Sequence, residues 1–325
     1  MPTRTAALDR VPAPALFVVS GLTQYLGAAI AVGLFAVAGA VEVGWLRIAA
    51  SALLLLAWRR PWRRRWTRHD LAWAAVFGVA LAAMNLAFYV AIDHLPLGTA
   101  VAIEFLGPVA VAAVTGSGWR ERGAIAVAAA GVVLLAGVTV GSDLPHDDAV
   151  LGLAAIAVAA ACWAAYIVLG RRVAVGGSGV TSLAVGMTVG ALAFAPFLAP
   201  DAVPVLGDWR HALAVVGIAL FSSVVPYALE QVILRRVSAA TFSVLLALLP
   251  ATAAVVGAVV LRQVPSPLEL VGLVLVSGAI AMTAARPGAG GRGEPDAVQA
   301  TAAPPAPGRG DDSGAAGGAP GGGGG

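Results

Sequence analysis

A single carboxyl group stands in the middle of one long apolar segment. Glu104 lies within PLGTAVAIEFLGPVAVAAV, and no Asp, Glu or Arg occurs within ten residues of it on either side. An ionised carboxylate at the centre of a bilayer costs roughly 3 kcal/mol or more, so such a residue is expected to face a cavity and to exchange a proton or meet a cation. The alternative is a protonated side chain that bonds a neighbouring helix.

Two prolines interrupt apolar segments at related positions. Pro108 cannot donate to the carbonyl of Glu104, and Pro250 cannot donate to the carbonyl of Leu246. The two prolines are 142 residues apart, and the same offset superimposes the segments around them. Helix breaks at corresponding places in two halves indicate a binding site near the middle of a membrane, although simple packing kinks give the same pattern.

Other polar and aromatic side chains lie within apolar segments. Asn85 and Tyr89 are four residues apart and therefore share one helix face, while Arg47 is expected either to bind a carboxylate or to extend to the membrane interface. The remaining candidate binding residues are Gln24, Trp163, Tyr166 and Tyr227. For each of these residues, a contact between helices is an equally good explanation. Glu230, five residues before Arg235, is expected in a gate or a surface ion pair.

No pattern for catalysis or metal binding accompanies these residues. All four His lie in loops or at segment ends, and neither a Walker loop nor an HExxH motif occurs. Cys162 is the only Cys, so no disulfide is expected within the chain. The segment WRRPWRRRWTRH directly follows an apolar run and is expected to anchor a helix at an anionic inner leaflet rather than to bind nucleic acid. The sequence therefore predicts no enzyme, no cofactor and no metal.

Composition explains why these polar residues are so isolated. Of 325 residues, 59% are hydrophobic and 11% are charged, and the mean hydropathy is +0.89, which excludes an ordinary soluble domain. A bilayer crossing needs about 20 apolar residues. Ten apolar runs fall at 14–36, 43–58, 71–92, 97–115, 121–140, 149–170, 179–199, 210–233, 238–260 and 267–285. We therefore predict an all-α membrane protein with ten transmembrane helices, in contact with lipid.

The distribution of Arg predicts the orientation in the membrane. Fifteen Arg fall in one set of alternate connections, and only Arg210 and Arg262 fall in the other. Positive residues accumulate on the cytoplasmic side, so both termini are predicted to be cytoplasmic. The Ala-rich composition, with Arg and no Lys, suggests a GC-rich bacterial genome and hence the bacterial plasma (inner) membrane.

The chain is predicted to consist of four parts: an N-terminal segment, two repeats and a C-terminal tail. After a cytoplasmic N-terminus at 1–13, residues 14–140 and 149–285 each contain five predicted helices. Because five is odd, the second set must cross the membrane upside down relative to the first, which gives an inverted repeat typical of transporters. Residues 286–325 are Gly, Ala and Pro-rich and are predicted to be disordered.

Four segments resemble a known family. They are MNLAFY at 84–89, PLGTAVAIEFLGP at 96–108, ACWAAYI at 161–167 and VPYALE at 225–230, and they resemble the EamA family of the drug/metabolite transporter superfamily, most closely its threonine and homoserine exporters. The resemblance covers about residues 15–285. Family members often carry an acid just before the second proline and a Gly-Glu pair at the outer end of that helix, where this chain has Leu249, Arg262 and Gln263.

The resemblance implies an inner-membrane exporter of small amino acids that exchanges cargo for protons. We expect alternating access, with the halves rocking around Glu104, which would bind the cargo ammonium while a helix end or Arg47 binds its carboxylate. An exporter of a drug, a purine or a sugar-derived metabolite is the first alternative, and a membrane enzyme or sensor is the second. The sequence leaves a homodimer, the exact cargo and the stoichiometry open.

Overall fold

The computed structural model describes residues 11–63, 66–115, 118–142, 144–174, 179–234, 236–237 and 239–284. Within these ranges the protein is built from helices, with no strand. Most of the predicted cytoplasmic N-terminus and the whole of the predicted disordered tail, 286–325, lie outside the described residues.

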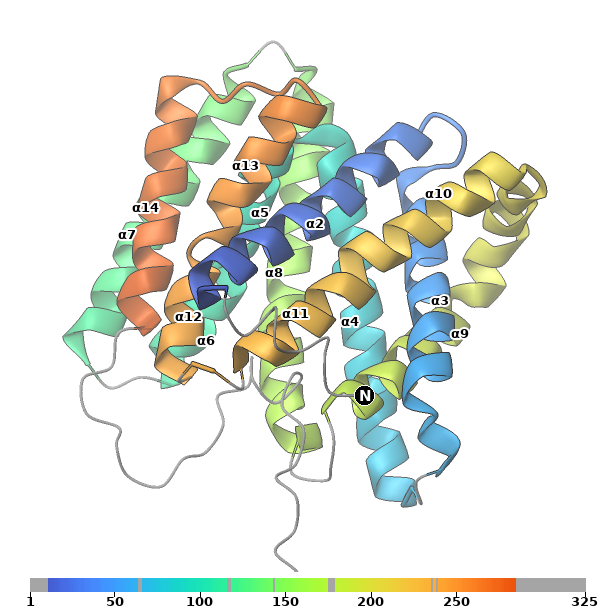
Figure 1. The fold of residues 1–325 in the computed structure, drawn as a ribbon. Helices are drawn as coiled ribbons and strands as arrows, with labels where there is room; N and C mark the ends of the chain where they lie inside the picture. Colours follow the sequence, from blue (N-terminus) through green and yellow to red (C-terminus); the bar gives the residue numbers. More distant parts are fainter. Residues whose placement is uncertain are drawn as a thin grey trace, which may run out of the picture.

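The helices follow the predicted apolar runs (Figure 1). The first half contains α2 (Ala13–Leu34), α3 (Ala40–Arg59), α4 (Arg68–His94), α5 (Leu97–Glu104), α6 (Leu106–Thr115) and α7 (Trp119–Val140). The second half contains α8 (His146–Ala174), α9 (Gly179–Ala202), α10 (Trp209–Ala219), α11 (Val225–Leu234), α12 (Ala239–Leu246), α13 (Leu249–Val260) and α14 (Pro267–Ala284). A π-helical turn, η3 (Leu220–Val224), joins α10 to α11.

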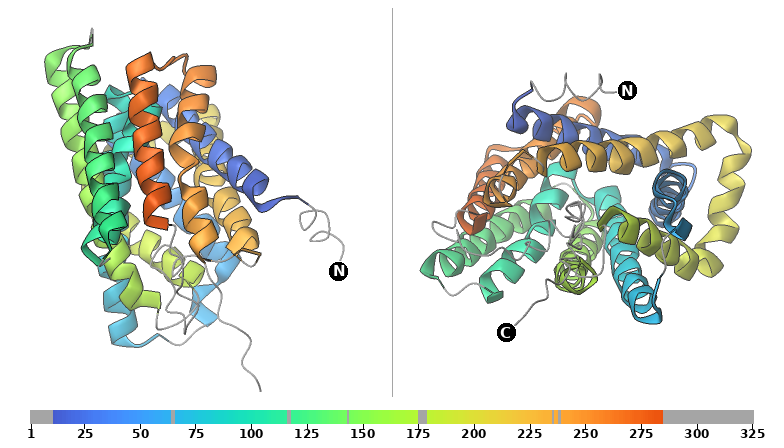
Figure 2. Two further views of the ribbon diagram at one scale, coloured as in Figure 1. Left: turned by 90° about the vertical axis from the view of Figure 1, so that its left-hand side faces the viewer. Right: turned by 60° about the horizontal axis from the view of Figure 1, so that its bottom comes forward.

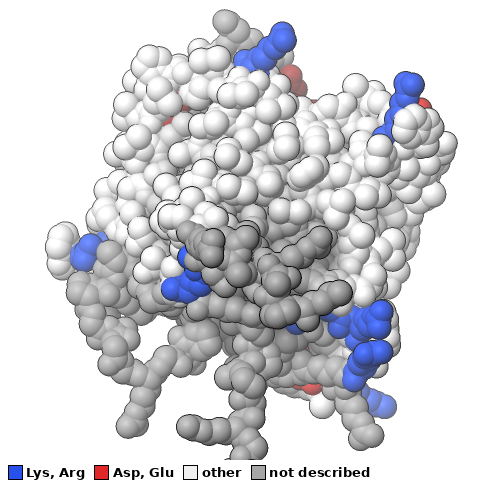
Figure 3. Space-filling model, viewed as in Figure 1, with Lys and Arg blue, Asp and Glu red and all other residues white. Residues whose placement is uncertain are grey.

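Eight helical segments are long and apolar enough to cross a membrane, and two further apolar segments, Val244–Val260 and Pro267–Thr283, are shorter. A helix satisfies its own backbone hydrogen bonds, which a bilayer requires of any spanning segment. Large apolar side chains point outward, among them Leu53 at 68% exposure and Val133 at 71%. Charged side chains gather toward the upper and lower ends of the molecule, with a broad uncharged surface between them (Figure 3). The fold is therefore that of a multi-pass membrane protein.

Two helices are interrupted at positions that correspond under the 142-residue offset. The first break lies at Phe105, between α5 and α6, and the second lies at residues 247 and 248, between α12 and α13. In each case a proline follows the break by a few residues, at Pro108 and Pro250, and cannot donate to the last residue of the preceding helix. The carbonyl of Phe105 instead accepts the N–H of Val109 at 3.2 Å.

Helices from the two halves pack against each other rather than forming two separate bundles. α4 packs against α8 and α9, α3 against α9, α5 against α13, and α7 against α14. α2 runs alongside α10 and α11 across one face (Figure 2). Three of these contacts join the same predicted span of each repeat: α3 with α9 in the second span, α5 with α13 in the fourth, and α7 with α14 in the fifth.

Glycines allow the closest of these approaches. A Cβ added at Gly78 of α4 would overlap the carbonyl oxygen of Gly186 on α9, and one added at Gly190 would lie 2.5 Å from the carbonyl oxygen of Gly78. The two backbones are therefore in direct contact. This close packing of small residues is the usual way for helices to associate in lipid.

Candidate functional site

Arg47 is the centre of a buried polar cluster. From α3 its Nη1 donates to Oδ1 of Asn85 at 2.8 Å, and its Nη2 donates to the carbonyl of Ser222 at 3.3 Å. Its guanidinium also lies over the ring of Tyr89, 5.5 Å from the centroid. Asn85 is held in turn, because its Nδ2 donates to the carbonyl of Leu81 at 2.8 Å. The sequence-predicted residues on α3 and α4 therefore come together, and α4 fixes the orientation of the amide that meets Arg47.

The Ser222 carbonyl is available to Arg47 because of local sequence. Pro226 follows Ser222 by four residues and has no N–H to donate to it. The backbone between them includes the π-helical turn, a geometry found frequently at functional sites. The break in this helix thus exposes a backbone acceptor to a cation on a neighbouring helix.

Two further hydrogen bonds attach the π-helical turn to its neighbours. Ser51 of α3 donates to Oγ of Ser223 at 2.9 Å, and the hydroxyl of Ser222 donates to the carbonyl of Gln24 at 3.3 Å. Gly27 of α2 lies against the same turn, since an added Cβ would be 2.8 Å from the backbone nitrogen of Ser222. Gln24 therefore contacts the cluster through its backbone carbonyl.

Two donors in the cluster lack an acceptor among the residues that the structure describes. Nε of Arg47 and the hydroxyl of Tyr89 are both buried, and neither has a hydrogen-bond partner among the described residues. The Tyr89 side chain is fully buried, and its hydroxyl lies within electrostatic range of the Arg47 and Ser222 side chains without a hydrogen bond of standard geometry to either. Buried polar atoms are nearly always paired, so such a pair of neighbouring donors calls for an explanation.

Glu104 lies near this cluster, at the last residue of α5. The side chain is 9% exposed, and no described residue donates a hydrogen bond to its carboxyl group. It is within electrostatic range of Arg47 and of Tyr25, but it forms no ion pair with Arg47. The helix break places Phe105 next to it, and the Phe105 ring packs edge-on against Trp163 with centroids 4.7 Å apart.

Further candidates extend the polar region along α11. Glu230 lies within electrostatic range of Tyr25 and Tyr227, and Tyr227 is also in range of Arg47. Arg235, with which the sequence suggested an ion pair, is outside the described residues. Opposite charges and phenol groups from α2, α3, α5 and α11 therefore converge in the interior.

Tyr166 lies in a different setting. Its ring packs against Phe77 at a centroid distance of 4.5 Å, in the contact between α8 and α4.

Sequence reasoning missed Tyr25 and Ser222. The free carbonyl of Ser222 could have been predicted in the same way as that of Glu104, because Pro226 lies four residues after Ser222. Tyr25 stands in an apolar run, and its spacing does not distinguish it.

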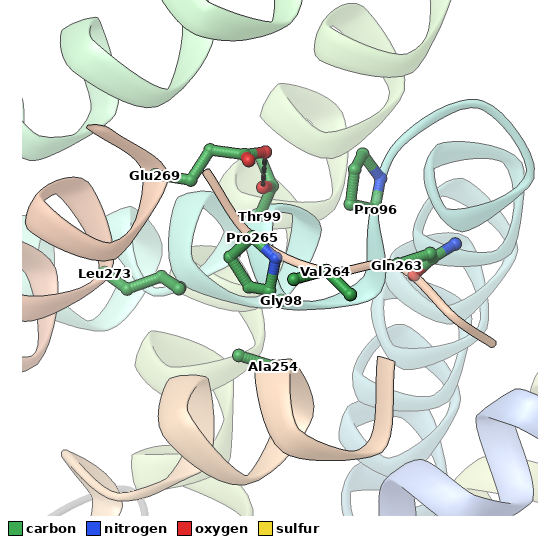
Figure 4. Close-up of a pocket in the computed structure, with 9 residues that line it drawn as sticks. All are labelled: Pro96, Gly98, Thr99, Ala254, Gln263, Val264, Pro265, Glu269 and Leu273. Atoms are coloured by element: carbon green, nitrogen blue, oxygen red, sulfur yellow. Dashed lines mark hydrogen bonds between the residues drawn. The ribbon is translucent and has the colours of Figure 1, made fainter. Parts of the chain in front are cut away.

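A separate pocket of about 140 Å³ lies where α5 begins, between α13 and α14 (Figure 4). Gln263 accepts the backbone N–H of Leu97 at 3.0 Å, and Thr99 donates to Glu269 at 3.3 Å. Gly98 brings α5 close to α13, because an added Cβ would be 2.9 Å from Cα of Ala254. Residues at the beginning of α5 are thus joined to the segment after α13.

No group of three or more His, Cys, Asp or Glu side chains that could hold a metal ion occurs within the described ranges. The cluster offers instead one cation, two carboxyl groups, phenols and unpaired donors. Such an arrangement suits the binding of a small polar solute.

Apolar helices around a buried polar cluster define a multi-pass membrane protein with an interior suited to a polar solute. The chain belongs to the EamA-like transporter family, whose profile matches residues 150–285. It is 36% identical to the threonine/homoserine exporter RhtA of Escherichia coli K12 over 247 residues, which is 76% of this chain and 82% of that protein. Identity to RhtA of Salmonella typhimurium is 35% with the same coverage.

The fold is similar to that of a protein whose crystal structure is known. It superimposes with a TM-score of 0.53 at 20% identity, over 83% of this chain and 95% of its own. At that identity the likeness concerns the fold alone. Family and relatives together identify the chain as a multi-pass bacterial membrane transporter of the exporter type.

Proposed function

We propose that this protein exports small amino acids of the threonine and homoserine kind from the cytoplasm by proton-coupled alternating access. The 36%-identical relative RhtA is a threonine/homoserine exporter, which supports this cargo class. The observation that carries the proposal for this chain is the Glu104 carboxyl, which is buried at a helix break, near a cation that is not its ion-pair partner.

The proposed cargo completes this arrangement of charges. A zwitterionic amino acid brings an ammonium group to Glu104 and leaves its carboxylate for a positive partner. An isolated carboxyl in apolar surroundings is stable when it is protonated or when it meets a cation. Cargo and proton therefore compete for Glu104, and this competition is the proposed basis of exchange.

The membrane potential and the pH gradient would drive this exchange. Each proton that moves inward contributes about 2.3 kcal/mol per 100 mV of potential. A difference of one pH unit contributes about 1.4 kcal/mol more. One proton per cargo molecule is then sufficient for a concentration gradient of tenfold or greater.

The proposed architecture is a pair of inverted five-helix repeats, 14–140 and 149–285, with ten crossings and both termini cytoplasmic. Support for the repeat comes from the two helix breaks at corresponding positions and from the contacts of α3 with α9, α5 with α13 and α7 with α14. Support for the orientation comes from the Arg distribution in the sequence. In the bacterial inner membrane this topology places the Arg47 end of α3 toward the outside.

The test is efflux of labelled threonine from preloaded cells. We expect wild-type efflux to collapse with a protonophore and Glu104→Gln to lose proton-dependent efflux. Glu42→Gln is the matched control, because Glu42 is a half-buried carboxyl near the start of α3 that lies against Gly39. Full proton-dependent efflux by Glu104→Gln would disprove the coupling role, and background efflux by every form would disprove the cargo.

A second candidate cargo is an aromatic metabolite or drug. The observation in its favour is the set of aromatic rings near Glu104: Phe105 packs edge-on against Trp163, and Tyr25 lies within electrostatic range. A panel of purines, aromatic amines and sugar derivatives in the same cells separates this cargo class from threonine.

A further inference from the structure

We propose that Nε of Arg47 and the hydroxyl of Tyr89 form a receptor for the carboxylate group of the cargo. The inference rests on the proposed function for its location in the transport path, and it deepens that function by naming the chemical group that the site recognises. The sequence alone leaves two candidate partners for the cargo carboxylate, a helix end and Arg47, and the receptor selects Arg47 together with Tyr89.

The first observation is the pair of unsatisfied donors. Nε of Arg47 and the Tyr89 hydroxyl are buried without a partner among the described residues, although buried polar atoms are almost always paired. The two donors belong to residues already in contact, since the guanidinium lies 5.5 Å from the Tyr89 ring centroid. The present contact of the two residues gives neither donor a hydrogen bond of standard geometry, and a single acceptor beside both side chains would satisfy them together.

The second observation is that neither donor is free to find another acceptor. The Tyr89 ring is held by α3, because a Cβ added at Gly44 would lie 3.2 Å from the ring, and the side chain is fully buried. Arg47 is fixed by its hydrogen bonds to Asn85 and to the carbonyl of Ser222. The donors are therefore positioned before any cargo arrives, which is the condition for a tight binding site.

The third observation is charge. Both acceptors of Arg47 are neutral, one an amide oxygen and the other a backbone carbonyl, and Arg47 forms no ion pair with Glu104. The guanidinium charge is thus not neutralised by a hydrogen-bonded acid. Arg47 is half-buried and its Nε is fully buried, so an anion at that nitrogen would pair the charge, and an Arg pairs best with a planar anion that accepts two hydrogen bonds.

These requirements select a carboxylate. Its two oxygens match two donors, one on Arg47 and one on Tyr89, while the other guanidinium contacts stay with Asn85 and Ser222. Glu104 would then take the cationic end of the same molecule. A cargo that lacks either charged end would lose one of the two contacts.

The experiment measures the thermal stability of the purified full-length protein in detergent with three matched probes. L-threonine carries both charged groups, 3-hydroxybutyrate lacks the ammonium, and L-threoninamide lacks the carboxylate. For the wild type, we expect L-threonine to stabilise the protein at a concentration at least about tenfold lower than L-threoninamide. We also expect a measurable shift with 3-hydroxybutyrate.

Two variants assign the receptor. Tyr89→Phe removes only the hydroxyl and should raise the half-saturating concentration of both carboxylates by about tenfold, with that of L-threoninamide unchanged. Arg47→Lys keeps the charge but loses the planar fork and should have a larger effect in the same direction. Tyr166→Phe, a buried Tyr in the contact between α8 and α4, is the matched control and should leave all three probes unchanged.

The outcomes separate this inference from the proposed function. The receptor is wrong if Tyr89→Phe weakens L-threonine and L-threoninamide equally, if Arg47→Lys leaves both carboxylates unaffected, or if no carboxylate stabilises the wild type. The cargo proposal alone is wrong if 3-hydroxybutyrate stabilises the wild type through Arg47 and Tyr89 whereas L-threonine does not.

Discussion

Arg47 donates a hydrogen bond to the backbone carbonyl of Ser222, across two helices and 175 positions of sequence. The bond exists because Pro226 has no N–H with which to occupy that carbonyl. A backbone irregularity on one helix therefore helps to orient the charged side chain of another. The π-helical turn is consequently part of the candidate site and not only a distortion of the helix.

Replacing Pro226 tests this relationship. Pro226→Ala supplies an N–H to the Ser222 carbonyl, so Arg47 should lose one of its two acceptors and threonine efflux should fall by about tenfold. The melting temperature should stay the same or rise, because a Pro is removed from a helix. Pro196→Ala is the control, since Pro196 lies inside α9 and has no N–H to donate to the carbonyl of Leu192, whose side chain is exposed. Equal losses of efflux in both variants would contradict the prediction.

Asn85 should affect stability and binding separately. Asn85→Leu removes the acceptor of Nη1 on the half-buried Arg47, so we expect a loss of about 1–3 kcal/mol in the free energy of unfolding together with lower efflux. Asn85→Asp keeps the acceptor but neutralises Arg47, so the protein should remain stable while its affinity for carboxylates falls. Melting curves and ligand-induced shifts measure the two effects. A fully stable Asn85→Leu would show that Arg47 finds another partner.

Gln263 should control access to the beginning of α5. Its side chain accepts the N–H of Leu97, beside the close contact of Gly98 with Ala254. Gln263→Ala removes this bond, and we expect Thr99→Cys, in a Cys162→Ala background, to react several-fold faster with a membrane-impermeant maleimide in right-side-out vesicles. Val264→Ala, at a side chain that is 81% exposed, is the control. Unchanged labelling would mean that the bond does not hold this end closed.

Contact between α4 and α9 should be the part of the fold least tolerant of larger side chains. Gly78→Ala places a Cβ on the carbonyl oxygen of Gly186, so the helices must move apart at a cost of about 1–3 kcal/mol. Gly217→Ala on α10 is the control, because an added Cβ there meets nothing within 4 Å. Melting temperatures in detergent compare the two. A Gly78→Ala protein as stable as Gly217→Ala would refute close packing at this position.

Much of the helical framework was predictable, because a segment that crosses lipid must be apolar and must satisfy its own backbone hydrogen bonds as a helix. Each of the ten apolar runs forms helix in the structure, and the breaks near Pro108 and Pro250 follow from the chemistry of proline. The number of membrane crossings stays a prediction, since two of the ten segments are short.

The contacts between the site residues were harder to predict from the sequence than the residues themselves. Arg47, Asn85 and Tyr89 were each identified as isolated polar residues, but their mutual contact depends on how α3 packs against α4, which sequence periodicity does not specify. Tyr166 was indistinguishable from a site residue for the same reason, and it lies in the contact between α8 and α4. Ser222 contributes mainly a backbone oxygen, which no side-chain pattern reveals.

The glycine contact between α4 and α9 has a mechanical consequence. The two backbones touch with no side chains between them at this contact, so we expect α4 and α9 to move together as one body that takes one helix from each half of the chain. Asn85 and Tyr89 stand on that body, whereas Glu104 and Ser222 stand at interruptions of other helices. When the site opens to either side, we therefore expect the interrupted helices to bend while α4 and α9 keep their relative position.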